Sequence, residues 1–134
     1  MGNPSSRMQS LLDGIPYARF LGVRVAGSKG HRELVLPFRP ELIGNPILPA
    51  IHGGVLGAFL ELTAILCLLD AGVRERLPKP INFSIDYLRT ARPRDTHARA
   101  EIFKLGQRIA NVHVVAWQTD PAKPVASGNG KFLW

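Results

Sequence analysis

The longest apolar run in the chain covers residues 53–69, where only Glu61 and Thr63 are polar. A run of this length without a polar face predicts a helix that is buried on nearly every side. It is shorter than the roughly 20 residues that a bilayer span needs, and a carboxylate near its middle would be costly in lipid. We therefore expect a central buried helix that ends near Gly72 and no membrane span.

Alternating apolar and polar positions on both sides of this run predict strands. Pro40, Pro46 and Pro49 disfavour regular structure over residues 39–51. The order is strands, one buried helix and then more strands joined mostly by hairpins, which predicts an α+β fold with an antiparallel sheet around the helix. The predicted strands cover residues 21–26, 32–38, 81–88, 98–105, 109–117 and 125–133.

Residues 4–13 carry a short helical pattern that Gly14 and Pro16 end. Because this pattern precedes the strands and carries few apolar residues, we expect a fringe helix over residues 1–14 that lies outside the core. A chain of 134 residues is too short for two ordinary domains, so the sequence predicts a single domain over residues 1–134.

Composition limits the partners and the compartment. Seventeen Lys and Arg against ten Asp and Glu give a net charge of +7, which favours anionic partners. The basic residues are scattered and few aromatics lie among them, so we expect no nucleic-acid partner. Cys67 is the single cysteine, and residues 1–10 lack the pattern of a signal peptide, which indicates a cytoplasmic protein. His31, His97 and His113 lie in separate regions, so no metal site is expected.

Glu61 is the most informative residue of the sequence. An ionised side chain on an apolar helix loses hydration and is either paired with a cation or used for function. Loss of hydration moves the pKa of a carboxyl group toward the range in which it acts as a base near neutral pH. The sequence leaves both interpretations open: a paired structural carboxylate and a functional base.

His52, Gly53 and Gly54 stand where the proline-rich loop becomes the apolar helix. Two glycines leave backbone N–H groups uncovered at a helix N-terminus, where the helix dipole favours negative charge. Such N–H groups suit an oxyanion. The same glycines also suit a tight turn, with His52 as a helix cap or a surface residue.

The stretch from Gly44-Asn45-Pro46 through His52-Gly53-Gly54-Val55-Leu56 to Glu61, followed by Tyr87-Leu88-Arg89-Thr90-Ala91, resembles the PaaI-type branch of the hotdog-fold acyl-CoA thioesterases. The resemblance covers roughly residues 15–134. It implies a hotdog fold and a homodimer or a dimer of dimers that hydrolyses acyl-CoA without a cofactor. It also implies that Glu61 is the base or nucleophile and that the Gly53 N–H holds the carbonyl oxygen, with His52 and Gly54 beside it.

Other residues are expected to contact the substrate. The resemblance assigns Asn45 to the loop before the histidine. It also expects a Ser or Thr where this chain has Pro80, and Asn82 and Ser84 are the polar residues close by that are candidates to replace it. After the next strand come Arg89, Arg92 and Arg94, whose guanidinium groups are well shaped to bind the phosphates of coenzyme A.

Thioester hydrolysis needs only a base and an oxyanion hole, because the leaving thiolate comes from a thiol with a pKa near about 8.5. A hotdog hydratase or dehydratase and a non-catalytic acyl-CoA or lipid-binding module remain alternatives. Gly54 and Glu61 are seven residues apart, about 10 Å along one helix, too far for both to touch one carbonyl group. A two-fold dimer with antiparallel helices would bring the glycines of one chain to the acid of the other.

Overall fold

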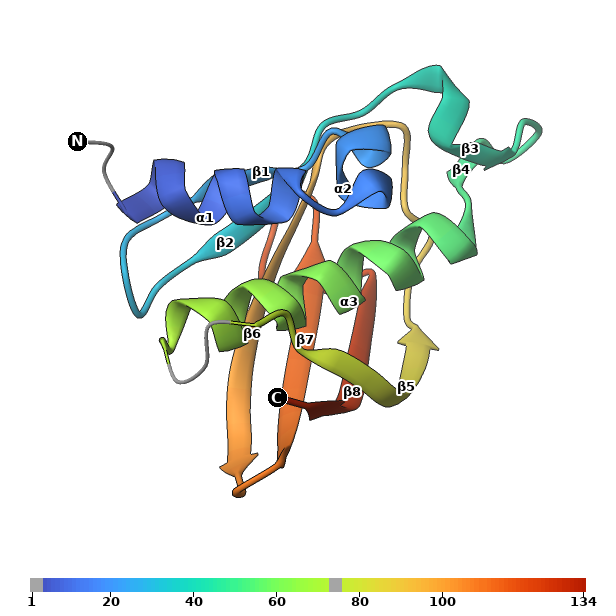
Figure 1. Cartoon of the computed structure of the whole chain (residues 1–134). Coiled ribbons are helices and arrows are strands. Elements are labelled where there is room, and N and C mark those ends of the chain that lie inside the picture. Colours follow the sequence, from blue (N-terminus) through green and yellow to red (C-terminus); the bar gives the residue numbers. More distant parts are fainter. Residues whose placement is uncertain (1–3, 73–75) are drawn as a thin grey trace.

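The computed structural model describes residues 4–72 and 76–134 (Figure 1). Helices and short elements come first, then the long helix, then four long strands. In chain order they are α1 (Pro4–Asp13), α2 (Pro16–Leu21), β1 (Arg24–Ala26), β2 (Glu33–Leu36), the 3-10 helix η1 (Pro40–Leu42), β3 (Ile43–Asn45), β4 (Ala50–Ile51), α3 (Gly53–Asp70), β5 (Lys79–Tyr87), β6 (Thr96–Leu105), β7 (Ile109–Trp117) and β8 (Ala126–Leu133).

One antiparallel sheet forms the framework of the molecule. It has six strands in the order β1-β2-β6-β7-β8-β5, and β3 and β4 form a separate small hairpin. Helix α3 lies across one face of this sheet (Figure 1). The α+β architecture predicted from the sequence, a sheet around one long helix, is therefore confirmed.

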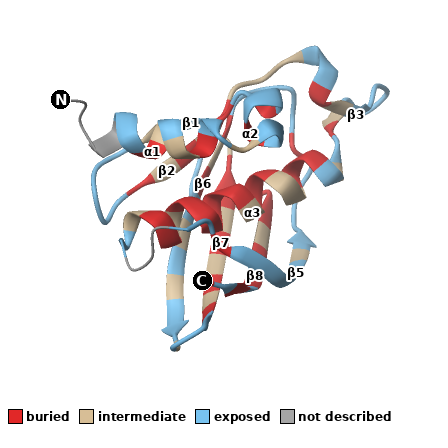
Figure 2. Ribbon diagram, viewed as in Figure 1, coloured by how far each residue is buried: buried red, intermediate tan, exposed pale blue. Residues whose placement is uncertain are grey.

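Helix α3 is buried as its composition predicts. Among the described residues it is the one helix with the length and hydropathy of a membrane span, yet most of it is buried inside the fold (Figure 2). The hydroxyl group of Thr63 donates a hydrogen bond to the carbonyl oxygen of Phe59 at 2.7 Å, so this buried polar group is satisfied. The apolar residues that α3 buries include Val55, Leu56, Phe59, Leu60, Leu62, Ile65, Leu66, Leu68 and Leu69.

The strands bury alternate residues, in keeping with their period of two. On β7 the even positions face α3 and are buried: Ala110, Val112, Val114 and Ala116. The odd positions of β7 lie on the opposite, outer face of the sheet. The predicted bounds of β7, residues 109–117, agree with the structure.

Three sequence predictions need correction. Helix α1 is part of the core rather than a fringe, because Met8 and Leu12 are buried in it. Leu21, expected to open a strand, ends helix α2 instead. The proline-rich stretch 39–51 does contain regular structure, namely η1, β3 and β4. Hairpins join most of the later strands as predicted, since β6 pairs with β7 and β7 with β8, whereas β5 pairs with β8 and its connection to β6 crosses the sheet.

The glycines of β8 make room for an aromatic ring. A Cβ atom on Gly130 would lie 2.5 Å from Cδ2 of Phe83 and 2.7 Å from Cε1 of Phe132. The two rings themselves pack edge to face, with centroids 6.2 Å apart. The glycine therefore lets β5 lay Phe83 across β8 beneath α3.

We expect Gly130→Ala to lower the free energy of unfolding by about 1–3 kcal/mol, the usual cost of overpacking a core. Ser127→Ala on the same strand, which faces outward, is the control and should change it by less than about 0.5 kcal/mol. Urea unfolding followed by circular dichroism measures both. Equal stability of the two variants would show that Phe83 moves aside freely.

Candidate active site

Backbone hydrogen bonds hold the segment that leads into the first turn of α3. The N–H of Ile51 donates to the carbonyl oxygen of Ala91 at 2.9 Å, and the N–H of His52 donates to that of Leu42 at 2.9 Å. Gly44 passes so close to His52 that a Cβ atom on it would lie 2.7 Å from the Cα atom of His52. These contacts fix where α3 begins.

His52 caps the helix with its side chain. The Gly54 N–H donates to Nδ1 of His52 at 2.9 Å, which is the capping role left open by the sequence. Nδ1 is therefore the acceptor nitrogen, and a neutral ring carries its proton on Nε2. His52 thereby uses up the Gly54 N–H as a donor.

The Gly53 N–H remains available. Within the described residues, 4–72 and 76–134, it makes no hydrogen bond, whereas the two N–H groups after that of Gly54, those of Val55 and Leu56, both donate to the carbonyl oxygen of His52. On the other side of the same residue, the hydroxyl group of Tyr87 donates to the carbonyl oxygen of Gly53 at 2.8 Å. Strand β5 thus holds the helix terminus in place while one N–H points free, as an oxyanion donor must.

Glu61 lies two turns further along α3. Gly57 faces Ile85 on β5, and Glu61, one turn beyond Gly57, lies on the same side of the helix. In the part of the chain that the structure describes, its carboxylate has no ion pair and no hydrogen-bond donor. Glu61 is therefore not a structural carboxylate that is paired within this part of the chain, which is one of the two interpretations left open by the sequence.

The surroundings of Glu61 change its acidity. Burial raises the pKa of its carboxyl group above the ordinary value of 4.5, because the charged form is less well hydrated there than in water. The side chain is half-buried, so water still reaches it. A carboxylate with raised basicity and access to water can act as a general base.

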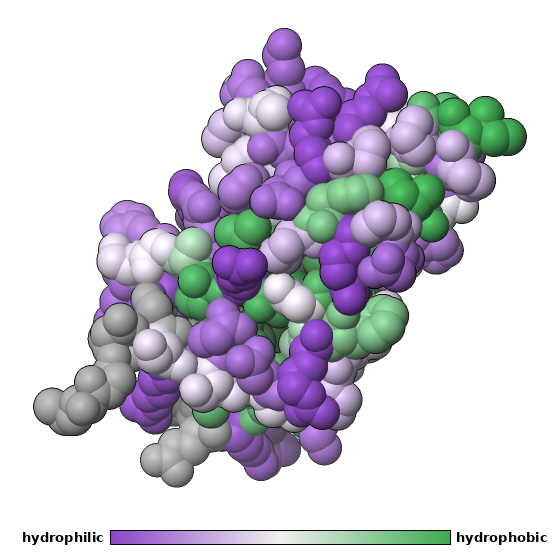
Figure 3. Space-filling model, turned by 90° about the horizontal axis from the view of Figure 1, so that it is seen from above, coloured by the Kyte–Doolittle hydropathy of each residue, from purple (hydrophilic) through white to green (hydrophobic). Residues whose placement is uncertain are grey.

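A cavity of about 440 Å³ lies beside Gly53. Its walls are mostly apolar and come from the β3–β4 hairpin, the first turns of α3 and the segment after β5. Seen from above, hydrophobic surface gathers at the end of the molecule where β3 and β4 lie (Figure 3). The lining residues are Leu48, Ala50, Ile51, Gly53, Leu56, Tyr87, Leu88, Arg89, Thr90 and Ala91.

The structure separates the other residues that are expected to contact the substrate. Arg89 lines the cavity, and its guanidinium group donates to the carbonyl oxygen of Pro124 at 2.8 Å. Arg92 and Arg94 are exposed on the following loop and do not line it. Asn45 lies in the β3–β4 hairpin, where Oδ1 accepts the N–H of Ile47 at 3.0 Å.

Asn82 does not lie near Gly53. It is opposite Lys131 in the sheet register, on the outer face, whereas α3 covers the inner face. Within one chain the structure therefore brings together Gly53, His52, Gly54 and Arg89, keeps Glu61 on the same helix, and leaves Asn82 on the other side of the sheet.

Gly53 and Glu61 are too far apart to act together within one chain. They are eight residues apart on one continuous helix, which is about 12 Å at the usual rise per residue. An attacking group and an oxyanion donor must both lie about 3 Å from the same carbonyl group. Gly53 and Glu61 of a single chain therefore cannot both contact one carbonyl group.

The thiol of Cys67 is not a competing nucleophile. Burial, with the charges of Asp70 and Glu101, raises the pKa of the Cys67 thiol to about 11, so the thiol stays protonated near neutral pH. The described residues contain no group of three His, Cys, Asp or Glu side chains that could hold a metal ion.

Two features of the site are not predicted by the sequence. One is the hydrogen bond from Tyr87 to Gly53, and the other is the apolar wall formed by Leu48, Leu56 and Leu88. The tyrosine lies in the segment that carries the resemblance, but its partner is 34 positions away. Only the packing of β5 beside the start of α3 brings the two together.

Comparison with known proteins defines the class. Residues 48–125 match the family model of the thioesterase superfamily, which is more than half of the chain, so the chain belongs to that superfamily. The predicted hotdog fold and the resemblance to thioesterases are thereby confirmed.

One named relative and two solved structures are similar to this chain. The medium/long-chain acyl-CoA thioesterase YigI of Salmonella typhimurium is 25% identical over 133 aligned residues, covering 89% of this chain and 85% of the relative. A protein from Chromobacterium violaceum, of known structure, is 36% identical with a TM-score of 0.74, covering 96% of this chain and 89% of its own. One from Pseudomonas aeruginosa has a TM-score of 0.85 at 24% identity, covering 97% and 98%.

We expect ionisation of Glu61 to lower the free energy of unfolding as the pH rises. A raised pKa means that the folded chain binds this proton more tightly than the unfolded chain, so its contribution is full below about 4.5 and is lost as the pH rises through the raised value. The neutral variant Glu61→Gln should therefore gain stability over the parent between pH 5 and pH 8. Urea unfolding at several pH values measures the difference.

The control for this experiment is Glu41→Gln, since the Glu41 side chain is 64% exposed and its ion pair with Arg39, at 4.0 Å, lies at the surface, where such pairs contribute little to stability. Its difference from the parent should change much less over the same pH range. A constant difference for Glu61→Gln would mean that the carboxylate is neutralised by a cation.

Proposed function

We propose that this chain hydrolyses acyl-CoA thioesters to the free acid and coenzyme A, at sites shared between two subunits. The observation that carries the proposal is the pair formed by an unpaired carboxylate of raised pKa, Glu61, and an unused N–H, that of Gly53, on one buried helix. Membership of the thioesterase superfamily supports the reaction class. No cofactor is needed for it.

In the proposed mechanism Glu61 takes a proton from water while the water oxygen bonds to the thioester carbon. The carbonyl oxygen becomes an oxyanion that accepts a hydrogen bond from the Gly53 N–H. The carbon–sulfur bond then breaks, and coenzyme A leaves as a thiolate that needs no strong acid. Alternatively Glu61 attacks the carbon directly and forms a mixed anhydride, which water cleaves to the same products. His52 acts as a positioning residue, because it caps the helix whose N–H is used.

The edge of the sheet supports a two-fold dimer. Strand β5 is nine residues long and pairs on one side only, with β8, and such an edge readily pairs with another chain. Above it, α3 leaves a strip incompletely covered, made of Gly53, Gly54, Gly57, Ala58 and Glu61. An antiparallel partner helix on this strip would bring each Glu61 to the other chain's Gly53.

The substrate class follows from the walls of the cavity. Apolar walls suit an apolar acyl chain, and the curated relative named above is a medium/long-chain acyl-CoA thioesterase. Arg89, at the rim, with the exposed Arg92 and Arg94 on the next loop, would bind phosphates of coenzyme A. We infer a homodimer, with a dimer of dimers as the larger assembly, acting in the cytoplasm.

The first test is Glu61→Gln, which keeps the shape of the side chain and removes the base. We expect kcat for thiol release from a panel of acyl-CoAs to fall at least about 100-fold, the lower end of what general bases contribute. In the parent, kcat/KM should rise with pH through the raised pKa of Glu61. Glu41→Gln, equally conservative and exposed, should keep parental activity.

The same assay separates the alternatives. A hotdog hydratase would hydrate an alkene in the acyl group without releasing thiol, and a binding module would bind acyl-CoA without reaction. Hydrolysis by Glu61→Gln within a few-fold of the parent would remove the carboxylate from the mechanism.

The second test addresses the shared site. Gly53→Pro deletes the proposed donor and fits the start of a helix; His52 already has φ −59° and ψ 133°, a conformation that a following proline allows. Gly53→Pro and Glu61→Gln should each be inactive, and their co-refolded mixture should recover activity, with about a quarter of sites intact if subunits pair at random.

The readout is thiol release by the mixture, after native mass spectrometry has verified mixed dimers. Co-refolding either variant with itself is the control. Verified mixed dimers without activity would place both groups of a site in one chain.

A further inference from the structure

The far end of the outer sheet face combines apolar and basic side chains. We call it the distal face and define it by six residues: Lys79, Phe103, Lys104, Ile109, Lys131 and Leu133. It lies on the side of the sheet away from α3, at the end where the β6–β7 hairpin extends past the helix (Figures 1 and 2). None of these residues takes part in the proposed hydrolysis.

The strand register makes the distal face continuous. Ile109, Leu133 and Lys79 lie opposite one another on β7, β8 and β5. In the next row, Lys104 lies opposite Asn111, which lies opposite Lys131. The register shift on β6 between Ile102 and Lys104 adds Phe103 beside this row, and its ring stacks on His113 of the outer face.

Its apolar members are more exposed than a folded domain requires. Phe103 is 67% exposed, Ile109 44% and Leu133 41%. Single exposed apolar side chains are ordinary, but a group of them surrounded by lysines marks an interaction surface.

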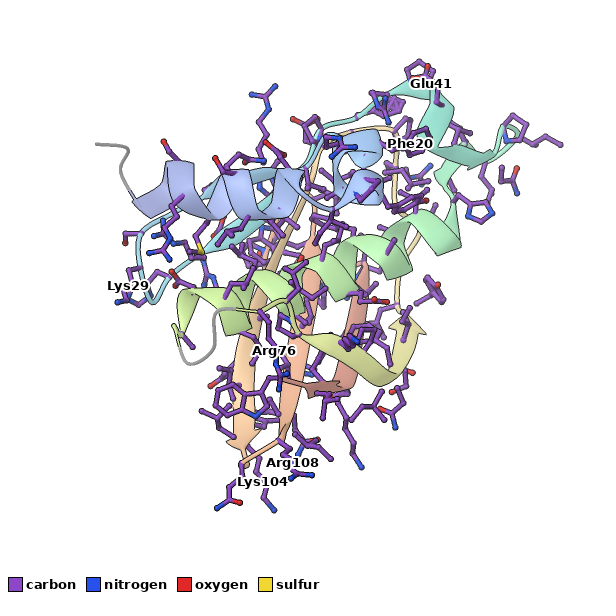
Figure 4. All side chains as sticks on the ribbon, in the orientation of Figure 1. Phe20, Lys29, Glu41, Arg76, Lys104 and Arg108 are labelled. Atoms are coloured by element: carbon purple, nitrogen blue, oxygen red, sulfur yellow. The ribbon has the colours of Figure 1, made fainter. Side chains whose placement is uncertain are left out.

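The charged residues that belong to the distal face are all basic. Lys79, Lys104 and Lys131 belong to it, and Arg108 projects from the adjoining turn beside Lys104 (Figure 4). On the rest of the outer face Glu33 pairs with Arg99, whereas Glu101 lies opposite His113, one row from Lys104.

The hairpin that carries this surface is held firmly. The indole N–H of Trp134 donates to the carbonyl oxygen of Gly106 at 3.0 Å, and the backbone N–H of Trp134 donates to that of Arg108 at 3.0 Å. The apolar and basic side chains are therefore presented in a fixed arrangement and lose little entropy on binding.

We propose that the distal face docks on an anionic lipid surface. Lysines next to exposed aliphatic and aromatic side chains fit the boundary between charged headgroups and acyl chains, where each basic residue adds to binding. Ile109 and Leu133 offer a nucleic acid nothing to stack against a base, and Phe103 already stacks on His113. A second copy of the chain bound to this face through its own distal face would place lysines against lysines, which repel one another.

The test is flotation of the full chain with vesicles of phosphatidylcholine alone or with a third phosphatidylglycerol, in the absence of acyl-CoA. We expect binding to the anionic vesicles that is lost in 0.5 M salt. Replacing Lys79, Lys104 and Lys131 together by Gln should weaken partitioning about 100-fold, since each surface lysine adds about five-fold. The charge-matched control replaces Arg7, Arg24 and Lys123 by Gln and should bind nearly as the parent does.

A second variant tests the apolar part. Ile109→Ser with Leu133→Ser leaves every charge in place and should still reduce partitioning at least about ten-fold, because two aliphatic side chains no longer enter the bilayer boundary. Unchanged unfolding midpoints exclude misfolding as the cause. The proposal would be overturned if the two charge variants lost vesicle binding equally, or if the chain bound only the vesicles without phosphatidylglycerol. Binding of an RNA oligonucleotide in place of vesicles, or self-association through this face, would also overturn it.

Discussion

The burial of an almost entirely apolar helix against an antiparallel sheet is the constraint on which the rest of the structure depends. Helix α3 has no polar face, so the chain must cover it with sheet and loops. The alternation of β7 and the glycines of β8 both serve this contact. Once α3 is fixed, the two groups of the candidate site are fixed as well, because Gly53 begins this helix and Glu61 lies in its middle.

The apolar patterns predicted the parts of the fold that local sequence determines. Helix α3 and strand β7 were located closely because burial imposes a period on their own residues. The pairing of β5 with β8 was not predicted, since it depends on which strand edge remains free after β6, β7 and β8 have formed. The sequence does not predict the short strands β3 and β4, because three prolines disfavour regular structure there. The hydrogen bonds that hold this hairpin in place also involve segments elsewhere in the chain.

The candidate site divides in the same way. The unusual position of Glu61 on an apolar helix is visible in the sequence, and so are the glycines at its start. The structure adds the hydrogen bonds. The Gly54 N–H donates to His52, and the hydroxyl group of Tyr87 donates to the carbonyl oxygen of Gly53. These contacts leave the Gly53 N–H as the unused donor. Neither can be read from residue types, because each depends on distances between side chain and backbone.

Assembly and acidity are connected in the proposed dimer. The strip of α3 that holds Glu61 is incompletely covered in one chain, and Gly57 and Ala58 on it are small enough for a second helix to approach closely. A partner helix over this strip would remove more water from Glu61, which raises its pKa, and would also bring the positive end of its own dipole near Glu61, which lowers the pKa. The dimer would then supply the distant oxyanion donor and set the basicity of Glu61 by the balance of these two effects. An unpaired carboxylate, which costs each separate chain stability, would become useful only when two chains meet.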